Sequence, residues 1–86
     1  REAAIEHAWL EVMERDALAR WWVERPVPRR RQVAGAPEAW ALDISAHDGI
    51  SVAVVLEECP GGLYLGAAAN RDWEMAVRRA ENEMRQ

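Results

Sequence analysis

The chain has 86 residues, of which 50% are hydrophobic and 30% are charged. That balance is typical of a single globular domain over residues 1–86 and excludes an intrinsically disordered chain. The formal net charge is −4, and all 11 basic residues are arginine. Because a duplex-binding protein needs clustered cations to displace counterions, this charge disfavours a general nucleic-acid binder.

Cysteine content and hydropathy set the expected compartment. Cys59 is the only cysteine, so no disulfide can form within the chain, and we expect a cytoplasmic location. No apolar run approaches the length of a transmembrane helix, and no signal peptide opens the sequence. The first residue is Arg1 rather than Met, so we expect a chain trimmed or excised from something longer.

The first predicted element is a long helix over residues 2–24. Its apolar residues recur at three- and four-residue spacing: Ile5, Trp9, Val12, Met13, Ala17 and Trp21. Pro26 ends the helix because proline lacks an amide proton and restricts the residue before it.

Two adjacent tryptophans, Trp21 and Trp22, stand at the end of this helix. Successive helical residues point about 100° apart, so at least one of the two indoles is part-exposed. They either wrap the edge of a small core or form an aromatic anchor for a partner or a second copy.

Residues 26–37 read as a linker rich in proline and arginine. The run Arg29, Arg30 and Arg31 lies between prolines, and such a segment is expected to be extended and exposed. It is either a solvated connector or an electrostatic contact for phosphate or an acidic protein surface.

Residues 38–69 predict a three-stranded antiparallel meander. Apolar residues alternate with small or polar ones on both sides of the turn at residues 47–49, and a second break at residues 59–62 leads into the strand 63–65. One face is the predicted core: Trp40, Leu42, Ile44, Ile50, Val52, Val54, Leu56, Leu63 and Leu65. The other face, which carries Val55 and Tyr64, is expected to be open to water or to a partner.

A second helix is predicted over residues 70–84, with Asn70 as its N-cap. The expected fold is therefore α+β, in the order α-β-β-β-α, with the meander covered on one face by both helices.

The titratable residues form no motif that indicates an enzyme or a metal centre. His47 with Asp43 and Asp48 could bind a metal at the hairpin tip, but an Asp-rich turn is more often only a turn. Glu57 and Glu58 are adjacent, so on a strand they face opposite sides. We therefore expect no catalysis, no cofactor and no metal.

The element order resembles the double-stranded RNA-binding domain. The resemblance is closest where residues 65–67 lead into residues 71–76, Arg-Asp-Trp-Glu-Met-Ala. It implies the topology, and some members of that family are dimerisation or protein-docking modules. The basic cluster that opens the second helix in that family is reduced here to Arg71, beside Asp72 and Glu74.

These observations favour a small non-enzymatic interaction domain, an adaptor, docking module or antitoxin-like inhibitor that binds another protein or itself and no membrane. The predicted partner-binding residues are Trp21, Trp22, Arg29, Arg30, Arg31, Val55 and Tyr64. The alternative is nucleic-acid binding of the double-stranded RNA-binding type, through Arg29, Arg30, Arg31, Arg71 and Arg78.

Overall fold

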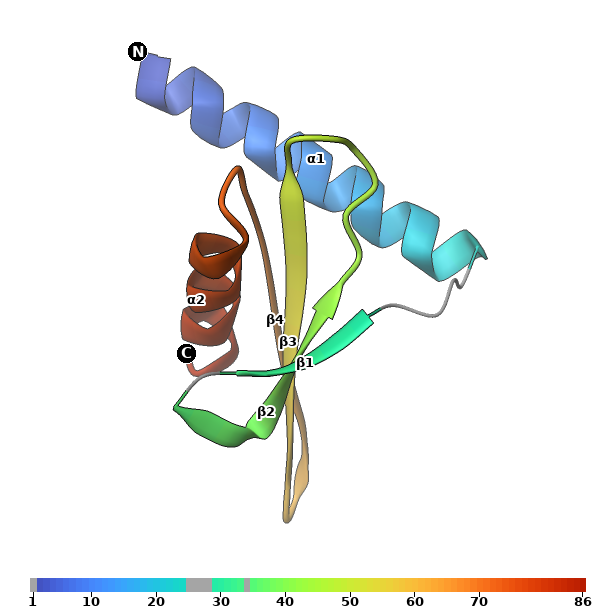
Figure 1. Ribbon diagram of the computed structural model, residues 1–86, viewed down its shortest axis with the longest axis vertical. Coiled ribbons are helices and arrows are strands. Elements are labelled where there is room, and N and C mark those ends of the chain that lie inside the picture. The colour runs from blue at the N-terminus through green and yellow to red at the C-terminus, as the bar shows by residue number, and fades with distance from the viewer. Residues whose placement is uncertain (1, 25–28, 34) are drawn as a thin grey trace.

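The computed structural model describes residues 2–24, 29–33 and 35–86 (Figure 1). The elements follow in the order α1 (Glu2–Glu24), β1 (Arg29–Val33), β2 (Ala36–Asp43), β3 (Ser51–Cys59), β4 (Gly62–Asn70) and α2 (Trp73–Met84). The class is α+β, as the sequence predicts. Helix α1 covers the range over which the apolar spacing predicts a helix.

The sheet has four antiparallel strands in the order β1-β2-β3-β4, so the prediction of three strands is wrong. The additional strand, β1, contains the arginines that were expected in a linker, and Arg30 pairs with Leu42 of β2. Charged side chains suit an edge strand because they discourage further strand pairing. Residues 26–28 and 34 of the predicted linker lie outside the described residues.

The central hairpins bring the predicted core residues of β2, β3 and β4 together on one face. Leu42 of β2 pairs with Val54 of β3, and Leu56 of β3 pairs with Leu65 of β4. At the turn between β2 and β3, Gly49 has φ +80°, a conformation that side chains with a Cβ rarely adopt. Strand β4 is longer than the predicted strand 63–65.

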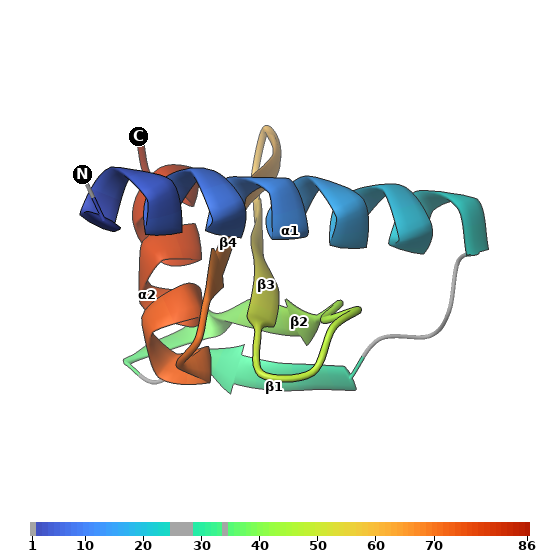
Figure 2. The same cartoon turned by 90° about the horizontal axis from the view of Figure 1, so that it is seen from above.

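The two helices cover opposite faces of the sheet, whereas the sequence predicts that both cover one face. The face under α1 holds the larger side chains: Leu42, Val52, Val54 and Ala69, packed against Leu10, Met13 and Trp21. The face under α2 holds smaller ones: Ala39, Ala41, Ala53, Val55 and Ala68, packed against Ala76, Ala80 and Met84. The small residues that suggested an open face let α2 approach closely. Figure 2 shows α1 and the edge strand β1 at opposite sides of the molecule.

Gly66 is the point of closest approach between β4 and α2. A Cβ at this position would collide with the backbone oxygen of Ala80 and lie 2.5 Å from the backbone nitrogen of Met84. Those are backbone atoms, so neither can give way by a side-chain rotation. Glycine is therefore required for α2 to pack at this distance.

Polar contacts fix α1 near its first turn and just past its middle. Near the first turn, Arg71 donates to Glu6 at 2.8 Å, and its guanidinium carbon lies 4.9 Å from the ring centroid of Trp9. Farther along, the ring nitrogen Nε2 of His47 lies 2.6 Å from Oδ2 of Asp16. Within the described ranges, no helix is long and apolar enough to span a membrane.

Candidate functional site

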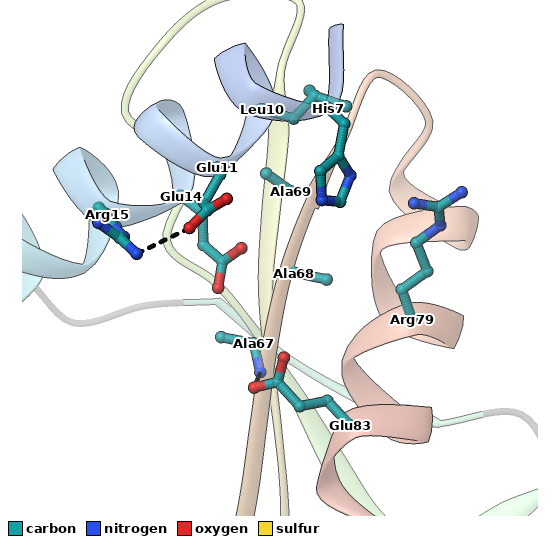
Figure 3. A pocket seen from close by; sticks show the side chains of 10 residues that line it. All are labelled: His7, Leu10, Glu11, Glu14, Arg15, Ala67, Ala68, Ala69, Arg79 and Glu83. Atoms are coloured by element: carbon teal, nitrogen blue, oxygen red, sulfur yellow. Dashed lines mark hydrogen bonds and ion pairs between the residues drawn. The ribbon is translucent and has the colours of Figure 1, made fainter. Parts of the chain in front are cut away.

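A crevice of about 370 Å³ separates α1 from α2, with the end of β4 as its floor (Figure 3). The floor consists of Ala67, Ala68 and Ala69, and these methyl groups leave space between the helices. Polar side chains from both helices line the walls: His7, Glu11, Glu14 and Arg15 from α1, and Arg79 and Glu83 from α2. Leu10 completes the lining. Two helices that are distant in sequence thus present charged groups to one space.

Glu83 is held at the crevice by the backbone of β4. The amide N–H of Ala67 donates to Oε1 of Glu83 at 3.2 Å. This contact fixes one carboxylate oxygen and leaves the second available for another donor or a cation.

Glu14 lies near other carboxylates of the crevice. Partial burial raises the pKa of its carboxyl group above the ordinary value, and the neighbouring carboxylates of Glu83 and Glu11 raise it further. Arg15 acts in the opposite direction, but it forms an ion pair with Glu11 at 2.7 Å. No basic side chain among the described residues forms an ion pair with Glu14. A cation beside Glu14 would relieve this accumulation of negative charge.

The crevice also supplies positive charge for an anion. Arg79 comes from α2 and Arg15 from α1, and Figure 3 shows Arg79 beside the space between the helices. A guanidinium can hold a phosphate or carboxylate through two parallel hydrogen bonds. Carboxylates and guanidinium groups at one crevice match a ligand that brings both an anion and a metal cation.

No group of three or more metal-ligating side chains comes together in residues 2–24, 29–33 and 35–86. A metal held entirely by these side chains is therefore not supported. His47, which was considered for a metal site at the hairpin tip, contacts Asp16 instead. Asp43 accepts hydrogen bonds from the backbone and hydroxyl of Ser45, as expected for a turn.

The predicted partner-binding residues are dispersed. Trp21 is half-buried against the sheet, while Trp22 is 69% exposed. This agrees with the expectation that at least one of the two adjacent indoles is part-exposed. Tyr64 is exposed, but Val55 is fully buried beneath α2. The expectation that Val55 faces water or a partner is therefore wrong, because α2 covers that face.

The predicted arginine cluster is also divided. Arg30 and Arg31 project to opposite faces of β1, where Arg30 lies over Trp40 at 5.4 Å and Arg31 over Trp73 at 6.0 Å. Arg31 and Arg78 line a second groove between β1 and α2. Arg71 lies elsewhere, paired with Glu6.

Sequence reasoning missed the crevice carboxylates Glu14 and Glu83. Two signals were available: four-residue spacing places Arg79 and Glu83 on one side of α2, and the Ala67–Ala69 run leaves a strand without bulky side chains. Neither signal indicates that α1 would lie opposite them.

The family model for YcaO cyclodehydratase, described as ATP- and Mg²⁺-binding, matches residues 1–86. The chain therefore belongs to the YcaO cyclodehydratase family. No curated protein and no solved structure gives a significant match.

This membership corrects the functional predictions. The family is enzymatic, so the expectation of a non-enzymatic adaptor, docking or inhibitor module is wrong. The resemblance to the double-stranded RNA-binding domain is likewise not supported, and neither is the function that it implied. Both predictions depended on element order and on the lack of a short catalytic motif. Element order is shared by unrelated functions, and a site assembled from separate helices leaves no such motif.

Proposed function

We propose that this chain forms part of an ATP-dependent cyclodehydratase, and that the crevice between α1 and α2 contacts the nucleotide phosphates together with magnesium. Family membership over residues 1–86 supports the activity. The location is carried by one observation: the carboxylates of Glu14 and Glu83 lie in the same crevice as Arg79, and Glu14 has a raised pKa.

The donor set fits magnesium bound with its nucleotide better than magnesium alone. Mg²⁺ keeps several waters and is usually held by one or two carboxylates plus substrate phosphates. Glu14 and Glu83 offer two carboxylates, and the described residues offer no larger cluster. The phosphates would therefore complete the coordination that these side chains leave open.

Each side chain has a separate role in this proposal. Glu14 and Glu83 would hold the metal, and the contact from Ala67 would orient Glu83. Arg79 would contact phosphate oxygens, because a guanidinium stays charged and pairs well with phosphate. When bound, ATP supplies a phosphoryl group that can turn an oxygen into a leaving group for the loss of water. The arginine and carboxylates then fix the charged end of the ligand.

Calorimetric titration with magnesium and a non-hydrolysable ATP analogue tests the location. Glu83→Gln retains an acceptor for Ala67 but removes the charge, so we expect at least about tenfold weaker binding, or about 1.4 kcal/mol. Glu81→Gln is the matched control, since Glu81 is on the same helix, pairs with Arg85 and does not line the crevice. Equal affinities for both variants would contradict the location.

The remaining predictions about partners are separate from this site. A cytoplasmic location stays a prediction. So does the role of Trp22 and Tyr64 as contact residues, for which their exposure is the supporting observation.

A further inference from the structure

Strand β1 forms one edge of the sheet. Among the described residues it pairs with β2 alone, so half of its backbone N–H and C=O groups point away from the sheet. Figure 2 shows β1 on the side of the molecule opposite α1, and Arg30, Arg31 and Gln32 are exposed. The register shift between Gln32 and Val33 confines the regular edge to residues 29–32. This edge can therefore pair with one further short strand.

The charges on this edge have the same sign on both faces of the sheet. The guanidinium carbon of Arg30 lies 5.4 Å from the ring centroid of Trp40, and that of Arg31, on the opposite face, lies 6.0 Å from the ring of Trp73. These contacts hold both guanidinium groups beside the edge. Neither group forms an ion pair within the described part of the chain, so both are available to a carboxylate.

The same charges decide which strand can pair with β1. Two copies of β1 laid edge to edge would place arginine opposite arginine, and like charges directly opposite destabilise a strand pair. An acidic strand would instead place a carboxylate opposite a guanidinium on each face. The edge therefore disfavours a second copy of itself and favours a chain with a run of acidic residues.

The groove between β1 and α2 lies beside this edge and adds to its positive charge. Its charged lining consists of Arg31 and Arg78 against Glu74 and Glu81, and Glu81 is paired with Arg85 at 3.1 Å. Among the described residues, two guanidinium groups thus stand against one carboxylate that has no basic partner. Alternate side chains of an added strand would extend toward this groove.

We propose that β1 is a docking edge for an extended acidic segment of another protein, which adds to the four-stranded sheet as a further strand. Main-chain hydrogen bonds would supply affinity, and the arginines on the two faces would select acidic residues. A nucleic acid lacks the repeating N–H and C=O groups that an open strand edge pairs with, so a polypeptide is the occupant. The edge lies at the end of the sheet opposite β4, which floors the crevice, so the proposal does not depend on nucleotide binding.

Fluorescence anisotropy with a labelled synthetic peptide tests the docking edge. The probe has a run of glutamates flanked by valine and threonine, and both of its ends are blocked. We expect it to bind the wild-type chain about tenfold or more tightly than either of two control peptides. One control has glutamine in place of glutamate, and the other is the acidic peptide with N-methylated backbone amides, which keeps the charge but prevents strand pairing. No binding, or equal binding of the methylated peptide, would overturn the proposal.

Substitutions distinguish this edge from the crevice. The double variant Arg30→Gln with Arg31→Gln should weaken binding of the acidic peptide about tenfold or more. Arg15→Gln with Arg79→Gln is the matched control, since it removes the same charge from the crevice walls, and its affinity should stay near that of the wild type. Circular dichroism establishes that both variants are folded. Equal weakening by the two double variants would overturn the proposal.

Hydrogen exchange followed by NMR identifies the mode of binding. With the acidic peptide bound, the amides of residues 29–32 that point away from β2 should exchange more slowly, while those of β4 should be unchanged. Unchanged exchange along β1 would overturn the addition of a strand. So would tighter binding of a single-stranded oligonucleotide than of the acidic peptide, because it would assign the arginines to phosphate.

Discussion

The carboxylate of Asp16 and the imidazole of His47 join α1 to the turn between β2 and β3, with 2.6 Å between Oδ2 and Nε2. The hydrogen bond from His47 lowers the pKa of Asp16 below its ordinary value of 3.8, and a second hydrogen bond from Arg20 lowers it further. Because the folded-state pKa is lowered, this contact stabilises the fold at pH values above the ordinary one. Its contribution is lost as the pH falls through the lowered pKa.

We expect His47→Ala to raise the pKa of Asp16 and to remove this part of the acid dependence of stability. The carboxyl-carbon chemical shift of Asp16, followed by NMR against pH, measures the effect. Arg20→Ala serves as the comparison and should also raise the pKa of Asp16, since Arg20 donates the second hydrogen bond to this carboxylate. An unchanged titration in the His47 variant would show that the contact is absent in solution.

Gly66→Ala should destabilise the fold by about 1–3 kcal/mol, the usual cost of overpacking. The added methyl group would meet the backbone of α2 at Ala80 and Met84, so the helix would have to move away from β4. Urea unfolding measures the change in free energy. Asn82→Ala, an exposed substitution on the same helix, should change stability little. A Gly66 variant as stable as wild type would contradict the close packing.

Glu14→Gln should stabilise the fold at neutral pH by less than about 1 kcal/mol, since the site is partly exposed to solvent. The pKa of Glu14 is raised, so ionisation of this group costs stability when the pH is above that pKa. The advantage of glutamine should therefore shrink as the pH falls through the raised pKa and disappear below the ordinary value of 4.5, where the carboxyl group is protonated in both the folded and the unfolded chain. Chemical unfolding at several pH values measures this trend.

Glu81→Gln provides the control for that experiment. Glu81 pairs with Arg85 and does not line the crevice, so its neutralisation should not relieve the negative charge around Glu14. A stabilisation by Glu81→Gln equal to that by Glu14→Gln would indicate a general effect of net charge, not a local accumulation at Glu14.

The sequence predicts the parts of the fold that depend on local pattern. The alternation around residues 47–49 predicts the central hairpin, and helical spacing predicts α1. Strand β1 was missed because Arg29–Val33 has no apolar alternation, and its extended form depends on pairing with β2. The sequence did not predict that α2 covers the face with Ala39, Ala41 and Ala53. Alanine is small and only weakly apolar, so hydropathy alone indicates a face open to solvent.

The candidate site could not be predicted for a related reason. Glu14 and Glu83 lie near opposite ends of the chain, and only the packing of α1 and α2 against β4 brings them to one crevice. The pKa of Glu14 is raised by burial, by Glu83, which is distant in sequence, and by Glu11 on the same helix. Of these causes, only Glu11 is visible in the local sequence. The pattern of either helix alone predicts only a solvated outer face.

The most direct test of the crevice as a metal-nucleotide site uses Mn²⁺ in place of Mg²⁺ with a non-hydrolysable ATP analogue. Paramagnetic broadening of the backbone amide signals is then mapped along the chain by NMR. We expect the strongest broadening at Ala67–Ala69 and around Glu14 and Glu83, and its loss in the Glu83→Gln variant. Broadening centred elsewhere, or unchanged in that variant, would contradict the proposed site.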